Sequence, residues 1–358
     1  MVWWMRTLLR CGVVLISGAS VSGCAVPYYW QAATGHLDLL NQRAPISEVL
    51  DDPEQSDATR EALLRAVEIR EFAVSELGLP DNDSYRSYAD VGRPYVVWNV
   101  VATEEFSVEA RRWCFPVAGC VIYRGYFEQQ DAERYAQSLR DEGLDTYVAG
   151  ASAYSTLGYF SDPILNTMLI GGEQYVAGII FHELAHQLHY IKGDTELNEA
   201  FASVVAEYGT QQWLLREGDL QVIEAYRSGL KRREDFSQLI SDQQTRLRAI
   251  YEHPDTAEDM RVAKRDSFLA LLSRYEALMA DWGGVSDYDA WFSRPLNNAQ
   301  LASVAAYSRW LPNLRSYLSS HGLTELYAEM ALLESLPPDA RRSRVEAYST
   351  TAFSSELR

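Results

Sequence analysis

The chain has 358 residues, a formal net charge of −18 at pH 7, and a hydrophobic content of 47%. This charge excludes nucleic acid as a partner and leaves no basic patch for anionic lipid, while the apolar fraction is that of a folded globular protein. We expect one α+β domain over residues 46–358, with a sheet-bearing part at 46–172 and a helical part at 173–358.

The first residues have the features of a bacterial targeting segment. Two arginines precede an apolar run that is too short to span a bilayer. The string Val21-Ser22-Gly23-Cys24 resembles a lipobox, which predicts cleavage before Cys24 and lipid attachment to its thiol. Residues 1–23 would then be a lipoprotein signal and residues 24–45 a lipidated arm, with the lipid as the membrane attachment. An ordinary secretory signal is the alternative.

The residue after the expected lipid site bears on the compartment. Ala25 follows Cys24, and by resemblance to lipoprotein sorting in Gram-negative bacteria this favours the outer membrane, facing the periplasm. Such a compartment is oxidising. Cys114 and Cys120, which remain after signal removal and lipidation, are therefore expected to form a disulfide across a tight loop. Two reduced, buried thiols are the alternative.

Periodicity predicts the elements that follow in chain order. A helix is expected over residues 57–77, ended by Gly78 and Pro80. Strands are expected over residues 95–101, 121–127 and 145–150, and a second helix over 131–142. From residue 173 onward the pattern is almost wholly helical, with long charged helices over 235–249 and 258–281.

The most informative motif is HExxH at residues 182–186, inside an apolar, helix-compatible run. His182 and His186 lie four residues apart, so both side chains share one helix face and can bind one Zn²⁺. Glu183 follows the first histidine, where a carboxylate can take a proton from a zinc-activated water. The motif therefore predicts a hydrolytic zinc site.

A catalytic zinc needs a third protein ligand. Gly193 is expected to end the motif helix, and Asp194 to cap a second helix that a short turn places antiparallel to the first. Glu199, in the first turns of that second helix, is the predicted ligand. The alternatives are Glu196, Glu207 and His189.

The string Asn198-Glu199-Ala200-Phe201-Ala202 resembles the second motif of the gluzincins, whose glutamate is the third zinc ligand. The interval from the first motif is shorter than in thermolysin-like members. The whole chain more closely resembles a family of predicted bacterial zinc aminopeptidases, many of which carry a lipoprotein signal. The resembling strings lie at residues 114–120, 123–127, 154–160, 182–186 and 296–299. The resemblance implies a zincin-like fold, one zinc ion per chain and a peptide substrate.

The leading hypothesis is a lipid-anchored zinc metallopeptidase, specifically an aminopeptidase, with Glu183 as general base. A zinc endopeptidase of the cell envelope is one alternative, and a non-catalytic envelope scaffold that keeps the zinc fold is another. The presence of Glu183 argues against the scaffold, because a purely structural zinc site needs no base.

Two further groups of site residues are predicted. In gluzincins a tyrosine or histidine from the helical half stabilises the oxyanion beside zinc, and Tyr307 is predicted for this role. Its competitors are His253, His321 and Tyr226. In many zincins an edge strand shortly before the zinc helix pairs with the substrate backbone. The residues predicted to bind peptide in this way are Tyr154, Ser155, Thr156 and Gly158.

Overall fold

A computed structural model describes residues 26–115, 119–253 and 256–348, without the side chains of residues 305–308. Within this part of the chain every strand precedes residue 173. The strands are β1 (Ala44–Pro45), β2 (Ser87–Ala89), β3 (Val97–Thr103), β4 (Trp113–Phe115), β5 (Gly119–Val121), β6 (Arg124–Tyr126), β7 (Asp145–Ala151) and β8 (Ile164–Leu165).

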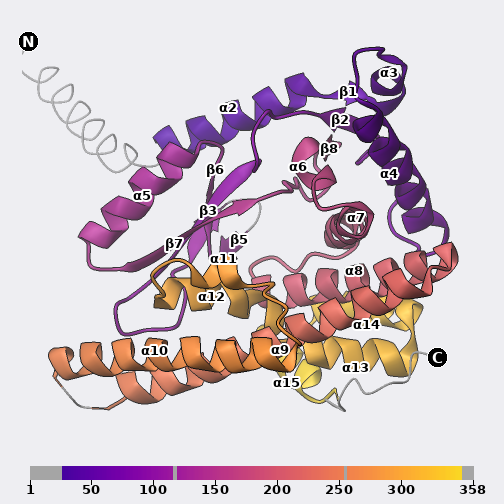
Figure 1. Ribbon diagram of the computed structural model, residues 1–358. Helices are drawn as coiled ribbons and strands as arrows, with labels where there is room; N and C mark the ends of the chain where they lie inside the picture. Colours follow the sequence, from indigo (N-terminus) through magenta and orange to yellow (C-terminus); the bar gives the residue numbers. More distant parts are fainter. Residues whose placement is uncertain (1–25, 116–118, 254–255, 349–358) are drawn as a thin grey trace, which may run out of the picture.

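Helices flank the strands in the first half and form nearly all of the second half (Figure 1). Those of the first half are α2 (Val26–Gln42), α3 (Ile46–Asp51), α4 (Asp57–Ser75), α5 (Gln129–Asp141) and α6 (Asn166–Leu169). Those of the second half are α7 (Glu173–Leu188), α8 (Thr195–Glu217), α9 (Leu220–Tyr251), α10 (Ala257–Asp281), α11 (Asp289–Phe292), α12 (Asn298–Ser308), α13 (Leu311–His321), α14 (Leu323–Ser335) and α15 (Pro338–Glu346). The prediction of an α+β fold with this division is confirmed.

The main sheet has the strand order β6-β3-β7 and is antiparallel throughout. Its register places Asn99 of β3 between Gly125 and Ala149. Val100 packs in the cluster that includes α5, while Val101 packs in the cluster that includes α12. Both faces of β3 are therefore buried, which explains its continuous apolar sequence.

Two smaller sheets complete the strands. The order β1-β2-β8 ties the segment after α2 to the segment before α6. The β4-β5 hairpin pairs Cys114 with Cys120, and these two residues form a disulfide in the structure. Among the described residues, no helix has both the length and the hydrophobicity needed to cross a bilayer.

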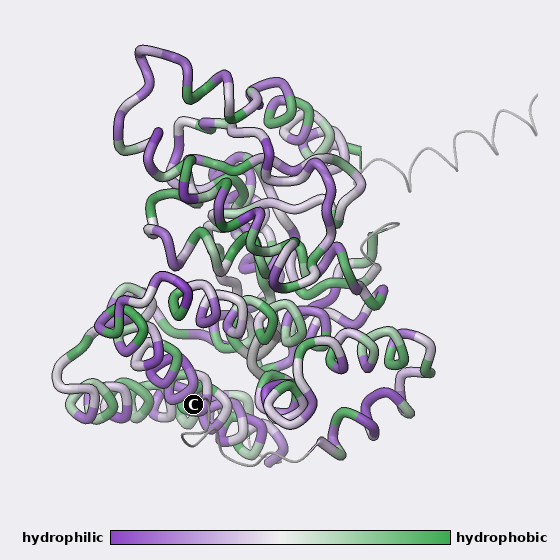
Figure 2. The backbone as a smooth tube through the Cα atoms, turned by 90° about the vertical axis from the view of Figure 1, so that its right-hand side faces the viewer, coloured by the Kyte–Doolittle hydropathy of each residue, from purple (hydrophilic) through white to green (hydrophobic). Residues whose placement is uncertain are grey.

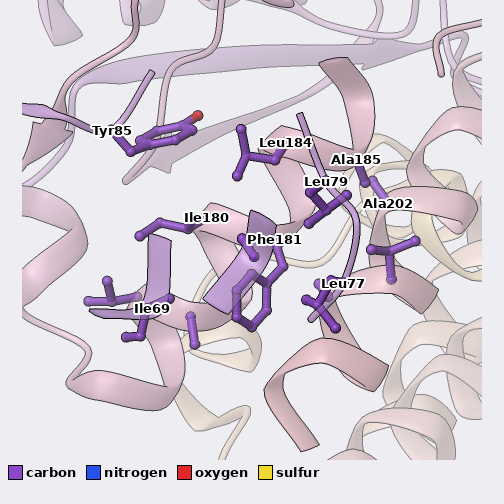
Figure 3. Close-up of a cluster of buried hydrophobic side chains, with 14 of the residues drawn as sticks. Ile69, Leu77, Leu79, Tyr85, Ile180, Phe181, Leu184, Ala185 and Ala202 are labelled. Atoms are coloured by element: carbon purple, nitrogen blue, oxygen red, sulfur yellow. The ribbon is translucent and has the colours of Figure 1, made fainter. Parts of the chain in front are cut away.

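The largest hydrophobic core surrounds α7. Figure 3 shows Ile180, Phe181 and Leu184 of this helix among side chains from α4 and from the segment that follows it. On α8, a Cβ atom at Gly209 would lie only 2.7 Å from the Phe181 ring and 2.5 Å from Leu77 Cδ1. Gly209 therefore permits α8 to approach α7 closely.

The charged segments predicted at 235–249 and 258–281 belong to the long helices α9 and α10, which lie side by side (Figure 1). In Figure 2 the colour alternates between hydrophobic and hydrophilic along most helices of this part, as expected for helices with one buried face. Phe236 of α9, Phe268 and Leu271 of α10, and Leu301 of α12 share one core cluster. Their packing fixes α12 between these helices and the sheet.

Two predicted elements differ from the structure. Residues 26–42, for which only a lipidated arm was expected, form the helix α2, because Pro27 is compatible with a first helical turn and one helix face packs on β6. The strand predicted over residues 121–127 is divided between β5 and β6. The chain changes sheets there, so that β5 pairs with β4 while β6 pairs with β3.

Candidate metal centre

Helix α7 places the two motif histidines on one face. The Nε2 atoms of His182 and His186 lie 3.1 Å apart, one helical turn from each other. The His186 side chain is 6% exposed and that of His182 is 21% exposed. The site is therefore mostly enclosed, with its more open side at His182.

The turn between α7 and α8 is held by Asn198. Its side-chain Oδ1 accepts from the Ile191 N–H at 2.8 Å, and its Nδ2 donates to the Ile191 carbonyl at 2.8 Å. Gly193 has a φ of +81°, which glycine adopts at no steric cost. Helix α7 ends at Leu188, earlier than expected, and this turn returns the chain to begin α8.

Asp194 does not cap α8 as predicted. It occupies the residue before the helix, but its side chain makes no capping hydrogen bond. Its carboxylate instead pairs with Arg341 Nη1 at 2.7 Å. A charged partner thus attracts this acid away from the helix N-terminus, and the ion pair attaches the turn to α15.

Glu199 completes a triangle of donor atoms with the two histidines. Its Oε2 lies 3.3 Å from His182 Nε2 and 3.7 Å from His186 Nε2. Zinc bonds of about 2.0–2.1 Å in tetrahedral geometry require ligand atoms about 3.3–3.4 Å apart. Two imidazole nitrogens and one carboxylate oxygen at these separations fit a single zinc ion.

The three residues are also electrostatically complementary. Burial lowers the pKa of His182, but the hydrogen bond and the charge of Glu199 raise it overall. Burial raises the pKa of Glu199, yet the two histidines bring it well below its usual range. The carboxylate is therefore held in its charged form, which is the form that can bind a metal ion.

The alternative ligands lie elsewhere. Glu196 pairs with Arg309, and Glu207 forms two 2.7 Å hydrogen bonds with Arg315. His189 faces Glu334, at 4.0 Å. Among the described residues, the set His182, His186 and Glu199 is the one whose ligand atoms converge tightly enough for a metal.

Three tyrosines that the sequence did not single out surround the acids of the site. Burial and then the charges of Glu199 and Glu183 raise the pKa of Tyr123, with Tyr190 contributing. Burial and Glu199 raise the pKa of Tyr190. Burial and Glu183 raise that of Tyr85, whose hydroxyl lies on the side of Leu184 (Figure 3). All three phenols are therefore neutral hydrogen-bond donors at neutral pH.

His253, His321 and Tyr226, the competitors predicted for the oxyanion role, are not assembled around this centre. Tyr307 lies on α12, and its side chain is outside the described residues. His253 is exposed after α9, and His321 stacks on Tyr317 at the end of α13. The pKa of Tyr226 is influenced by Glu207 and Arg315 and not by the residues of the histidine motif. Of the three tyrosines Tyr85, Tyr123 and Tyr190, Tyr123 is the one whose pKa is raised by both Glu199 and Glu183.

The segment from Tyr154 to Gly158 is a loop after β7, so the prediction of an edge strand is wrong. Asp162, which is 1% exposed, holds this loop. Its carboxylate accepts from the Thr156 N–H at 2.9 Å, from Thr156 Oγ1 at 2.9 Å and from Ser155 Oγ at 3.3 Å. Burial raises the pKa of Asp162 to about 6, although the hydrogen bonds from Thr156 and Ser155 act to lower it.

The same loop rests on the motif helix. Gly158 has a φ of +81°, and a Cβ atom there would lie 3.5 Å from the Gln187 side chain. Gln187 directly follows the second motif histidine. Asp162 thus positions the predicted peptide-binding loop next to the metal centre. The outer edge of β7 is already occupied, because the carbonyls of Thr146 and Val148 accept from Asn297 and Arg294.

The disulfide-closed hairpin supports the turn between the two ligand helices. Arg112 donates from Nη2 to the Gly193 carbonyl at 2.8 Å. A Cβ atom at Gly119 would lie 2.9 Å from the Gly193 nitrogen, so the two backbones touch. Arg112 and Gly119 therefore support the turn that joins the two ligand helices.

We expect Asn198→Ala to weaken the site without touching a ligand. The change leaves the buried Ile191 N–H and carbonyl unpaired, at about 1–3 kcal/mol for each group. Glu199 is adjacent, so zinc affinity should fall together with the free energy of unfolding. Denaturant titration and competition with a zinc chelator measure the two effects.

Asn313→Ala is the matched control for this prediction. Asn313 is also buried and donates to the Val345 and Tyr348 carbonyls, far along the chain from the ligands. It should lower stability while zinc affinity stays at the parent value. Equal zinc affinities in both variants would show that Asn198 does not position Glu199.

Comparison with known families agrees with this geometry. A family model described as "Putative aminopeptidase" matches residues 27–345. The chain belongs to this family. No curated protein and no solved structure matches the chain. Membership supports a peptidase-like, hydrolytic function for the protein.

In this member of the family, the string at residues 296–299 has a structural role. Asn297 donates to the Thr146 carbonyl at 3.0 Å. Asn298 donates from its backbone to Asp145 Oδ2 and from its side chain to the Glu105 carbonyl, both at 3.0 Å. These bonds attach α12 to the sheet. Tyr123 packs in the cluster that contains Val101 of β3 and Ala299 of α12. The string therefore helps to hold this tyrosine in place.

Proposed function

We propose that the chain is a zinc metallopeptidase of the aminopeptidase type, anchored to the bacterial envelope by lipid on Cys24. The observation that carries the catalytic part is the triangle of His182, His186 and Glu199, with Glu183 on the same helix. Family membership supports the reaction class. The Cys24 sequence context supports the anchor, although this residue lies outside the described part of the chain.

The donor set fits zinc in type, number and spacing. Zinc held by these three residues would lower the pKa of a water molecule and polarise the scissile carbonyl. Within the described chain, the half-buried Glu183 carboxylate has neither an ion pair nor a hydrogen bond to another side chain. It can therefore accept a proton from the attacking water and deliver it to the leaving amine.

Tyr123 is the proposed hydrogen-bond donor to the developing oxyanion. Its phenol is neutral because burial and the nearby carboxylates raise its pKa. It packs against Val101, Ala299 and Ala302, which hold the ring between β3 and α12. A fixed neutral donor stabilises negative charge that develops in the transition state without reorganisation. We propose Tyr123 for this role on the described residues, and Tyr307 stays a prediction.

Tyr123→Phe is expected to lower kcat by about 10²–10³-fold, the range for loss of one oxyanion donor. KM and zinc content should change little, because the hydroxyl acts in the transition state. Tyr147→Phe is the matched control, since Tyr147 lies in the same cluster but is influenced by Arg294 and Tyr95 instead of the motif acids. Steady-state kinetics at saturating zinc decide the matter. Parent kcat in Tyr123→Phe would remove this tyrosine from the mechanism.

Peptides with free and acetylated N-termini test the proposed specificity. An aminopeptidase cleaves only the free peptides, because it must bind the terminal amine. Cleavage of both sets would indicate an endopeptidase, and cleavage of neither by the zinc-loaded protein would indicate a scaffold. Glu173, the first residue of α7, is not available to bind the terminal amine of a substrate, because Arg65 and Trp213 both donate hydrogen bonds to its carboxylate.

A further inference from the structure

Helix α2 is docked on the domain through one face. Gln31 donates to the Gly125 carbonyl and accepts from the Phe127 N–H. A Cβ atom at Gly35 would lie 2.2 Å from the Phe127 ring, so the helix and this ring are in direct contact. Tyr28 lies under the Arg124 guanidinium, 4.0 Å from ring centre to Cζ. The orientation of α2 on the domain is therefore fixed.

The opposite face of α2 is apolar and exposed. Val26, Trp30, Ala33 and Leu37 follow one another at helical spacing and form what we call the outer stripe, with Tyr29 beside it. Exposure is 61% for Val26, 71% for Trp30 and 55% for Leu37. Figure 1 shows α2 along an outer edge of the molecule. The stripe thus faces away from the core.

The segment that carries this stripe differs from the rest of the chain in having no charged residue. Between Val26 and Leu37 there is no Asp, Glu, Lys or Arg, although the whole chain carries a net charge of −18. Exposed tryptophan and tyrosine at the start of the helix have the apolar body and polar edge that suit the headgroup region of a bilayer. Uncharged apolar surface with an aromatic end indicates lipid as the occupant, since an electrostatic partner would require charge.

The position of α2 in the chain supports the same occupant. Only Ala25 lies between Cys24 and Val26. The two residue steps from Cys24 to Val26 span at most about 7 Å when fully extended. Lipid on Cys24 would therefore hold the first turn of α2 at the headgroups, within the depth that interfacial helices reach.

We propose that α2 lies flat on the bilayer, with the outer stripe in the headgroup region and the inner face on the domain. This inference rests on the proposed lipid anchor and adds a second, non-covalent contact to it. The anchor alone would leave the domain free to rotate, whereas the stripe fixes one face of the domain against the lipid.

His36 of α2 connects the proposed membrane contact to the loop beside the proposed active site. Its ring lies 4.8 Å from that of Phe160 and 5.8 Å from that of Tyr154, and Arg43 donates to the Ser161 carbonyl. Tyr154, Phe160 and Ser161 belong to the loop that rests on the motif helix. Tyr159 in the same loop is 72% exposed. The orientation set by α2 therefore places the predicted peptide-binding loop at the bilayer surface.

The test uses the full chain purified from bacterial membranes and reconstituted in phosphatidylcholine vesicles that contain acyl-brominated lipid. Bromine quenches tryptophans inside the bilayer. Trp30→Phe should remove most of the quenchable emission of the parent. Trp282→Phe, which changes a partly buried tryptophan after α10, should not. Leu37→Glu should reduce quenching, whereas Leu332→Glu, at a 41% exposed site on α14, should not.

Mass spectrometry of Cys24 on the same samples separates the stripe from the anchor. Lipid on Cys24 with an unquenched Trp30 would overturn the stripe and leave the anchor standing. Quenched Trp30 without lipid would support the stripe and reject the anchor, and failure of both would reject both. Light scattering tests whether a second copy of the chain, rather than lipid, covers the stripe. An unquenched Trp30 in a dimer that Leu37→Glu dissociates would assign the stripe to a second copy of the chain and overturn the inference.

Discussion

Glu183→Gln is expected to abolish most peptide hydrolysis while zinc content and fold remain those of the parent. The amide has nearly the shape of the carboxylate but cannot accept the proton. Loss of a general base costs about 10²–10⁴-fold in rate, and more where the same group also protonates the leaving amine. Glu183 is not a member of the ligand triangle, so metal binding should survive. Turnover at saturating zinc, with elemental analysis of the same sample, measures both.

Glu199→Gln is the matched comparison for this variant. It makes the same chemical change at a residue whose oxygen lies 3.3 Å from His182 Nε2. An amide is a poorer zinc ligand than a carboxylate, so metal affinity and activity should fall together. Parent-rate hydrolysis by zinc-loaded Glu183→Gln would reject the mechanism. If both variants are inactive on peptides yet support the same envelope function, the scaffold hypothesis takes precedence.

His186→Ala is expected to eliminate stoichiometric zinc. The parent should contain one zinc per chain, and the variant keeps only two ligands. The change also removes a partner of the buried Glu199 carboxylate, which would then lack much of its charge compensation. Zinc at about a thousand times its Kd should stabilise the parent by about 4 kcal/mol and the variant by almost nothing. Thermal unfolding with and without added zinc measures this difference.

His321→Ala controls for the loss of a histidine. His321 is exposed at the end of α13, where it stacks on Tyr317. Its removal should leave both zinc content and the zinc-dependent rise in Tm unchanged. Full zinc occupancy in His186→Ala would show that the ligand assignment is wrong.

The ligand triangle could be predicted because its residues are close in sequence. His182 and His186 are linked by helix geometry, and Glu199 by a short turn into an antiparallel helix. Local spacing therefore carried the prediction. The helices at residues 57–77 and 131–142 were predicted to within a few residues for the same reason.

Tyr123 and Asp162 could not be predicted in this way. Their roles depend on long-range packing, which brings β3, α12 and the loop after β7 to the motif helix. Tyr123 begins the resembling string at residues 123–127, but that string also contains Tyr126, and the sequence does not show which of the two faces the motif acids. Asp194 failed as a cap because Arg341, which is remote in sequence, competes for its carboxylate. The direction of the outer stripe likewise depends on the long-range contacts that dock α2 on the domain.

The close approach of α8 to α7 at Gly209 bears on which ion the centre selects. Glu199 lies on α8 about 15 Å from this crossing point, while both histidines lie on α7. The distance between the helix axes therefore sets the size of the donor triangle. Short separations suit an ion with bonds near 2.1 Å, whereas Ca²⁺ needs about 2.3–2.6 Å and more oxygen ligands. We expect a residue larger than glycine at this crossing to widen the triangle, so the preference for zinc that we propose would depend partly on a position that no ion touches.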